Sequence, residues 1–88
     1  MQHPTVPSPG MTEAEADLRC AGNLADAEAL LAKADIAFLR GDHPKASSFY
    51  GAALNAALNQ TQPGKVAREI PRIEAMLHWL VQRYRRWI

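Results

Sequence analysis

The sequence has little of what secreted, membrane and nucleic-acid-binding proteins need. It holds one cysteine, which cannot form a disulfide within the chain, and three histidines whose spacing matches no metal motif. No window approaches the ~20 apolar residues of a membrane span, and the start lacks a signal peptide. The net charge of +1 leaves no basic face for nucleic acid. We therefore expect a cytoplasmic protein without a membrane span, nucleic-acid partner, metal or cofactor.

Catalytic residue patterns are also lacking. His43 follows Asp42, but a general base needs a substrate pocket and a third, orienting group, so turn capping explains the pair better. The thiol of Cys20 has no histidine or basic cluster close in sequence to activate it. At 88 residues the chain is one small domain. We expect no catalytic residues and no enzymatic activity.

Proline is concentrated at the start of the chain. Pro4, Pro7 and Pro9 lie within residues 1–11 and exclude a helix there. The composition favours a disordered lead, with a short polyproline ligand as the alternative. Residues 12–88 then form a single helical domain.

Two helices are predicted in the first half of that domain. Thr12 and Glu15 have the form of a capping box, which predicts a leading helix over 12–22. After a break, Asn23 is expected to cap a second helix over 24–40. The apolar positions of this second helix recur at three- and four-residue spacing and form its buried face: Ala27, Leu30, Leu31, Ala34, Ala37 and Phe38.

Ile36 lies on the opposite side of the second helix, with Ala25, Ala29 and Ala32. A stripe of small apolar residues is suited to close contact with another helix. We expect a further helix of the same chain to cover it, and a partner is the alternative.

A well-specified turn follows the second helix. Gly41 tolerates left-handed dihedrals, and Asp42 or His43 can cap the next helix, with Pro44 in its first turn. A third helix is predicted over 43–60, and its apolar residues keep helical spacing throughout: Ala46, Phe49, Tyr50, Ala53, Leu54, Ala57 and Leu58. The two helices therefore form an antiparallel hairpin.

A last helix is predicted over 66–88, with a bend or its regular start at Pro71. Its apolar residues alternate by four and three, as in a coiled-coil seam: Ile70, Ile73, Leu77, Leu80, Tyr84 and Trp87. Packed on the hairpin, this third long helix completes an all-α, three-helix bundle.

The hairpin resembles a tetratricopeptide repeat. Gly41 matches the turn glycine of that family, Ala46 its small residue, Tyr50 its aromatic, and Ala53 with Leu54 the following pair. The family consists of helix-turn-helix modules of about 34 residues, whose stacked copies form peptide-binding grooves. The chain departs from the family where Leu30, Lys33, Ala37 and Leu58 replace its tryptophan, leucine, tyrosine and closing proline.

Two further families share features with this span. The glycine turn, long helices and third antiparallel helix look like the microtubule-interacting-and-trafficking domain, a three-helix unit that receives helical peptides in a groove. A weaker resemblance is to the helical N-terminal region of some bacterial aspartyl/asparaginyl β-hydroxylases, which are 2-oxoglutarate dioxygenases. The first two resemblances imply a protein–protein interaction or scaffold domain that binds a helical or extended peptide. The third implies an accessory domain whose catalytic domain is absent from this chain.

Trp79 is the leading candidate for contact with a partner. If the seam of the last helix faces inward, Trp79 projects outward, and Arg72, Arg83 and Arg86 flank it at helical spacing. Tryptophan and arginine dominate binding hot spots, so these residues and Ile36 form the predicted partner-binding surface. The alternatives are that Trp79 packs under the leading helix or a continuation of the chain, and that the arginines mark a solvated helix end. A protein or peptide, a neighbouring domain and a second copy all remain open as partners.

Overall fold

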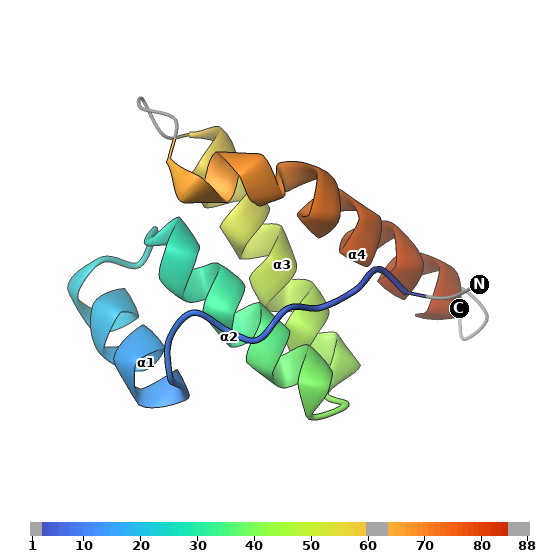
Figure 1. Ribbon diagram of the computed structural model, residues 1–88, viewed down its shortest axis with the longest axis horizontal. Helices are drawn as coiled ribbons and strands as arrows, with labels where there is room; N and C mark the ends of the chain where they lie inside the picture. Colours follow the sequence, from blue (N-terminus) through green and yellow to red (C-terminus); the bar gives the residue numbers. More distant parts are fainter. Residues whose placement is uncertain (1–2, 60–63, 85–88) are drawn as a thin grey trace.

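The computed structural model describes residues 3–59 and 64–84. Within these two stretches every element of regular secondary structure is a helix, which confirms the predicted all-α fold class (Figure 1). The predicted seam residue Trp87 and the candidate Arg86 lie outside the described residues. The elements are α1 (Glu13–Gly22), α2 (Ala27–Leu39), α3 (His43–Leu58), a short 3-10 helix η1 (Lys65–Glu69) and α4 (Ile70–Tyr84).

The turn between α2 and α3 has the conformation that its sequence requires. Gly41 has a φ of 81°, in the left-handed region where a side chain would be strained. Asp42 caps α3, because its carboxylate accepts a hydrogen bond from the backbone N–H of Lys45 at 3.3 Å. The hairpin is therefore fixed locally, by residues adjacent in sequence.

Helix α2 begins three residues later than the sequence suggested. Asp26, not Asn23, is its cap and accepts from the N–H of Ala29 at 3.1 Å. The carboxylate of Asp26 also receives the guanidinium of Arg19 at 2.9 Å. This ion pair joins the end of α1 to the start of α2, and a negative charge at a helix N-terminus is favourable.

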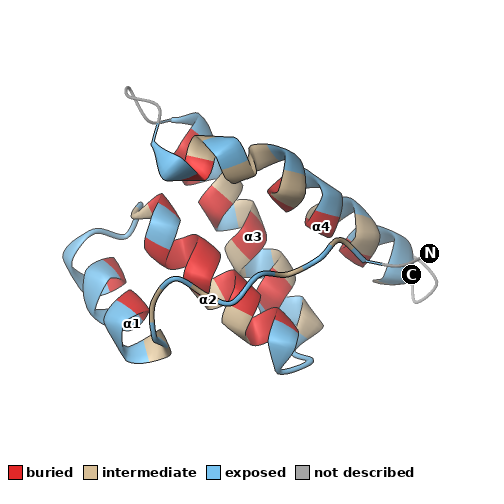
Figure 2. Cartoon of the chain, in the orientation of Figure 1, coloured by how far each residue is buried: buried red, intermediate tan, exposed pale blue. Residues whose placement is uncertain are grey.

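Helix α2 is the centre of the fold, because α1 packs on one side of it and α3 on another (Figure 2). Ala16 and Cys20 are the buried residues of α1. Salt bridges from Lys33 to Asp17 at 2.7 Å and from Arg40 to Glu13 at 2.6 Å also join the two helices. A further helix of the same chain, α1, therefore packs along the small-residue side of α2.

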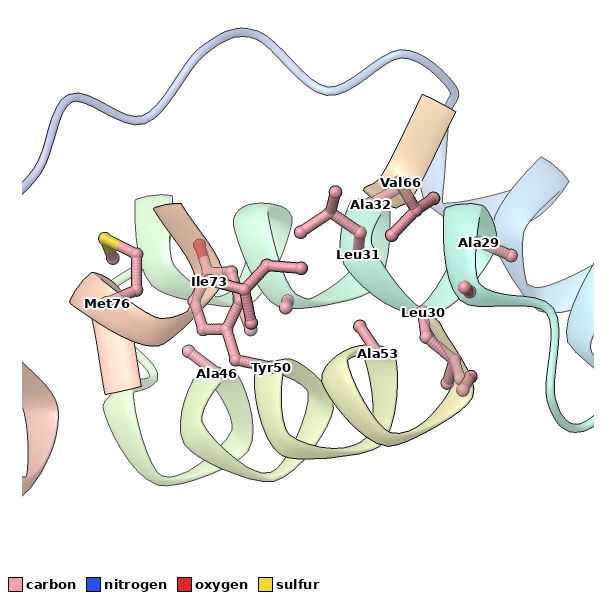
Figure 3. Packing of buried hydrophobic residues seen from close by; sticks show 14 of the residues in the cluster. Ala29, Leu30, Leu31, Ala32, Ala46, Tyr50, Ala53, Val66, Ile73 and Met76 are labelled. Atoms are coloured by element: carbon pink, nitrogen blue, oxygen red, sulfur yellow. The ribbon is translucent and has the colours of Figure 1, made fainter. Parts of the chain in front are cut away.

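The core combines many small side chains with a few large ones. Over half of its buried apolar residues are alanines, so the helices can approach closely. The largest fully buried side chains, Tyr50, Ile73, Met76 and Leu80, lie on α3 and α4, and Figure 3 shows Tyr50, Ile73 and Met76 close together. Large side chains therefore fill the space between the hairpin and the last helix.

Helix α4 is rotated relative to the predicted seam. Its buried line runs through Ile73, Met76 and Leu80, whereas Leu77 and Tyr84 are only partly buried. A coiled-coil seam assumes lengthwise packing on one helix. In the structure Arg72 and Trp79, at the edge of α4, contact Asp35 and Phe38 of α2. With these contacts in place, Met76 and not Leu77 faces the core.

Residues 3–11, which we call the N-terminal strap, cross the bundle in an extended conformation and end at α1 (Figure 1). The sequence indicated a disordered lead, but Val6 and Met11 pack against the core and the His3 ring lies 4.9 Å from that of Phe38. Proline composition excludes a helix correctly, yet it carries no information about the apolar surface that an extended segment can cover.

Candidate recognition surface

Trp79 belongs to a cluster of aromatic rings contributed by the strap, the end of α2, the start of α3 and α4. Its ring centroid lies 5.4 Å from that of His3, 5.7 Å from Phe38 and 5.6 Å from His43. His43 stacks on Phe38 at 5.1 Å, and Tyr84 lies 6.0 Å from His43. Edge-to-face and stacked pairs are each worth about 0.5–1.5 kcal/mol beyond the area they bury. Trp79 is consequently partly buried, beneath the strap instead of the leading helix.

The structure separates the arginines that the sequence had grouped around Trp79. Arg83 is exposed and its guanidinium lies 5.4 Å from the centre of the Trp79 ring, a cation–π contact. Arg72 points away to a buried ion pair, and Arg86 lies outside the described residues. Among the described arginines of this group, the surface at Trp79 therefore includes Arg83 and not Arg72.

The buried partner of Arg72 is Asp35, which sequence reasoning missed. Asp35 is 3% exposed and receives two hydrogen bonds from the Arg72 guanidinium, at 2.9 and 3.1 Å, and one from the Tyr50 hydroxyl. Glu69 accepts from Nε of Arg72 at 2.6 Å. In the sequence Asp35 lies among the apolar residues of the predicted second helix. A charged residue in such a stretch was the signal that could have identified a buried ion pair. The group joins α2, α3 and α4 through one carboxylate.

The two hydrogen-bond donors to Asp35 have raised pKa values. Burial raises the pKa of Tyr50, and the hydrogen bond to Asp35 raises it further. Burial works to lower the pKa of Arg72, but hydrogen bonds to Asp35 and Glu69 more than offset this, so the pKa rises. Tyrosine and arginine already keep their protons at neutral pH. Both side chains therefore remain donors to the Asp35 carboxylate, and their hydrogen bonds hold the helices together.

Ile36 lies beside the other end of the strap. It lines an open hollow of about 500 Å³ whose walls are the strap residues from Pro9 onward, the first turn of α1 and Arg40. A smaller hollow next to it is bordered by Ile36, Lys33 and Lys45. The side chain of Ile36 is partly exposed, so α1 does not cover it completely.

His43 is the titratable centre of the aromatic cluster. Burial lowers its pKa below the ordinary value of 6.5, and the positive charges of Arg83 and His3 lower it further, while Asp42 acts in the opposite direction. The cluster therefore favours the neutral imidazole.

We predict that the domain loses stability as the medium becomes acidic. Because the pKa of His43 is lower in the folded than in the unfolded chain, the unfolded chain binds more protons as the pH falls through 6.5. The free energy of unfolding, measured by urea denaturation, should fall between about pH 7.5 and pH 5.5. His43→Gln should reduce this loss, whereas His78→Gln, at an exposed position of α4, should not. An identical loss in all three proteins would contradict the assignment to His43.

No group of three or more histidine, cysteine, aspartate or glutamate side chains is placed to hold a metal ion in residues 3–59 and 64–84. None of the described helices has the length and apolar character needed to cross a membrane. The chain matches no family model, no curated protein and no solved structure.

Proposed function

We propose that this chain is a non-enzymatic protein-recognition domain that binds an extended peptide segment. The observation that supports this most directly is the N-terminal strap, an extended segment with three prolines that lies against the helices. Extended segments that carry proline lose little conformational entropy when they dock, and aromatic surfaces are their usual receptors.

Two of the candidate residues from the sequence lie at opposite ends of the strap. Trp79 contacts His3 near its start, and Ile36 lines the hollow beside Pro9 and Met11 near its end. We define the recognition surface by the side chains that border the strap, Ile36, Phe38 and Trp79, together with His43 and Arg83, which contact Phe38 and Trp79. Aromatic residues and arginine are enriched in such surfaces.

The resemblance to tetratricopeptide and microtubule-interacting-and-trafficking domains agrees with this proposal, since both imply a peptide ligand. In the described part of the chain the residues of the recognition surface come from α2, the start of α3 and α4. A ligand of strap-like length would reach from the aromatic cluster to the hollow at Ile36.

The experiment loosens the strap in the full-length chain and supplies the same segment as a free peptide. Val6 packs against the core and Thr5, its neighbour, is exposed, so Val6→Asp and Thr5→Asp form a pair with equal charge. The probe is a fluorescein-labelled peptide of residues 1–11, followed by fluorescence anisotropy.

We expect the Val6→Asp chain to bind this peptide about tenfold more tightly than the Thr5→Asp chain, because a tethered strap competes at millimolar effective concentration. Adding Ile36→Asp to the Val6→Asp chain should abolish the binding, with the fold checked by circular dichroism. Equal binding by the Val6→Asp and Thr5→Asp chains, or none by either, would overturn the proposal.

A further inference from the structure

We infer that the strap is a displaceable occupant of the recognition surface, and that the preferred partner is an extended segment with an acidic side chain where the strap places His3. This inference rests on the proposed function and adds to it the chemistry of the ligand. It is drawn from the charges that surround one end of the strap.

Basic groups outnumber acidic ones around this position. His43, the first residue of α3, stacks on Phe38, and the exposed Arg83, from α4, lies over Trp79. The strap adds His3, a third base, against the same two aromatic rings.

Asp42 is the acidic group that acts on His43. Its carboxylate is already used as the cap of α3, where it accepts from the N–H of Lys45. In the described part of the chain no carboxylate forms a salt bridge with Arg83. The position occupied by His3 is therefore one where a negative charge would be attracted and a positive charge repelled.

The strap is held by contacts that a competing segment can replace. Its described contacts with the helices are those of side chains: the ring of His3, and the partly buried Val6 and Met11. His3 Nδ1 shares a hydrogen bond of 2.7 Å with the carbonyl of Pro4, inside the strap itself. A segment that kept the apolar contacts of Val6 and Met11 and exchanged the imidazole for a carboxylate would give up the ring contacts with Phe38 and Trp79 and gain an ion pair with Arg83.

Proton uptake would favour the exchange. Phe38 of α2, Asp42 of the turn, and Trp79, Arg83 and Tyr84 of α4 are the groups that face the two imidazoles. When His43 becomes positively charged, a carboxylate at the position of His3 has a second positive neighbour besides Arg83. Acid should therefore strengthen the attraction for an acidic ligand.

The test uses the full-length Val6→Asp chain and three labelled peptides of residues 1–11: the native sequence, its His3→Gln form and its His3→Glu form. Binding is measured by anisotropy at about 20 mM and about 500 mM salt, where the screening lengths differ several-fold. The comparison of glutamate with glutamine isolates the charge, because the two side chains have nearly the same shape.

We expect the His3→Glu peptide to bind about fivefold more tightly than the His3→Gln peptide at low salt, the size of an exposed ion pair. The advantage should shrink at high salt and disappear when the chain also carries Arg83→Gln. If all three peptides bind equally at both salt concentrations, the inference about the acidic ligand is wrong and the proposed function stands. If none of them binds, the proposed function itself fails.

Discussion

Replacing Arg72 with methionine is expected to lower the free energy of unfolding by about 3–5 kcal/mol. The Asp35 carboxylate, 3% exposed, would lose both guanidinium hydrogen bonds and remain buried with the Tyr50 hydroxyl alone. An uncompensated buried charge is among the costliest single defects, and a small domain has only about 5–15 kcal/mol of stability in total. Urea denaturation at pH 7 measures the change.

Two further variants keep this prediction testable if the Arg72→Met chain does not fold. Asp35→Asn combined with Arg72→Met should recover much of the loss, because a neutral amide is far less costly to bury and can still accept from Tyr50. Glu69→Gln, which alters the more exposed partner of Arg72, should change the stability by less than about 1 kcal/mol. A double variant no more stable than Arg72→Met would contradict the role assigned to the Asp35 charge.

Met76→Ala is expected to destabilise the domain by about 2–5 kcal/mol, and Leu77→Ala by clearly less. The two residues are adjacent on α4, yet Met76 is 0% exposed in the core and Leu77 is only partly buried. Truncating a fully buried side chain removes its burial and leaves a cavity, whereas a partly exposed site retains solvent contact. Thermal or urea unfolding of the two variants measures the difference directly.

This pair also distinguishes the observed packing of α4 from the seam that its sequence suggested. In the predicted seam Leu77 faces inward and Met76 does not. A larger loss from Leu77→Ala than from Met76→Ala would therefore mean that α4 packs through the predicted seam. The rotation matters for recognition, because it brings Trp79 to the edge of α2 and leaves Arg83 beside it.

The two stability predictions and the recognition surface depend on the same helix. Arg72 joins α4 to Asp35 of α2. Met76, one turn further along α4, is fully buried in the core. Trp79, one turn further on, meets Phe38 and the strap. A variant that releases α4 from the hairpin should consequently impair peptide binding without touching the recognition surface.

Local sequence features determined the helices and the hairpin of this protein. The Thr12 capping box, the positive φ of Gly41 and the cap at Asp42 each depend on residues within a few positions of one another. Apolar spacing of three and four residues was sufficient to identify the all-α class and the buried face of α2. Such signals can be recognised in a single sequence because the interactions that produce them act over one or two helical turns.

The tertiary structure alone decided the rotation of α4, the ion pair between Asp35 and Arg72, and the docking of the strap. The members of that ion pair are 37 residues apart, and His3 meets Trp79 from the opposite end of the chain. No spacing rule links residues at such separations, because their contact depends on how the helices cross. Sequence reasoning therefore found Trp79, Arg83 and Ile36 as candidates, while the aromatic cluster and the strap that bring them into one surface required the assembled fold.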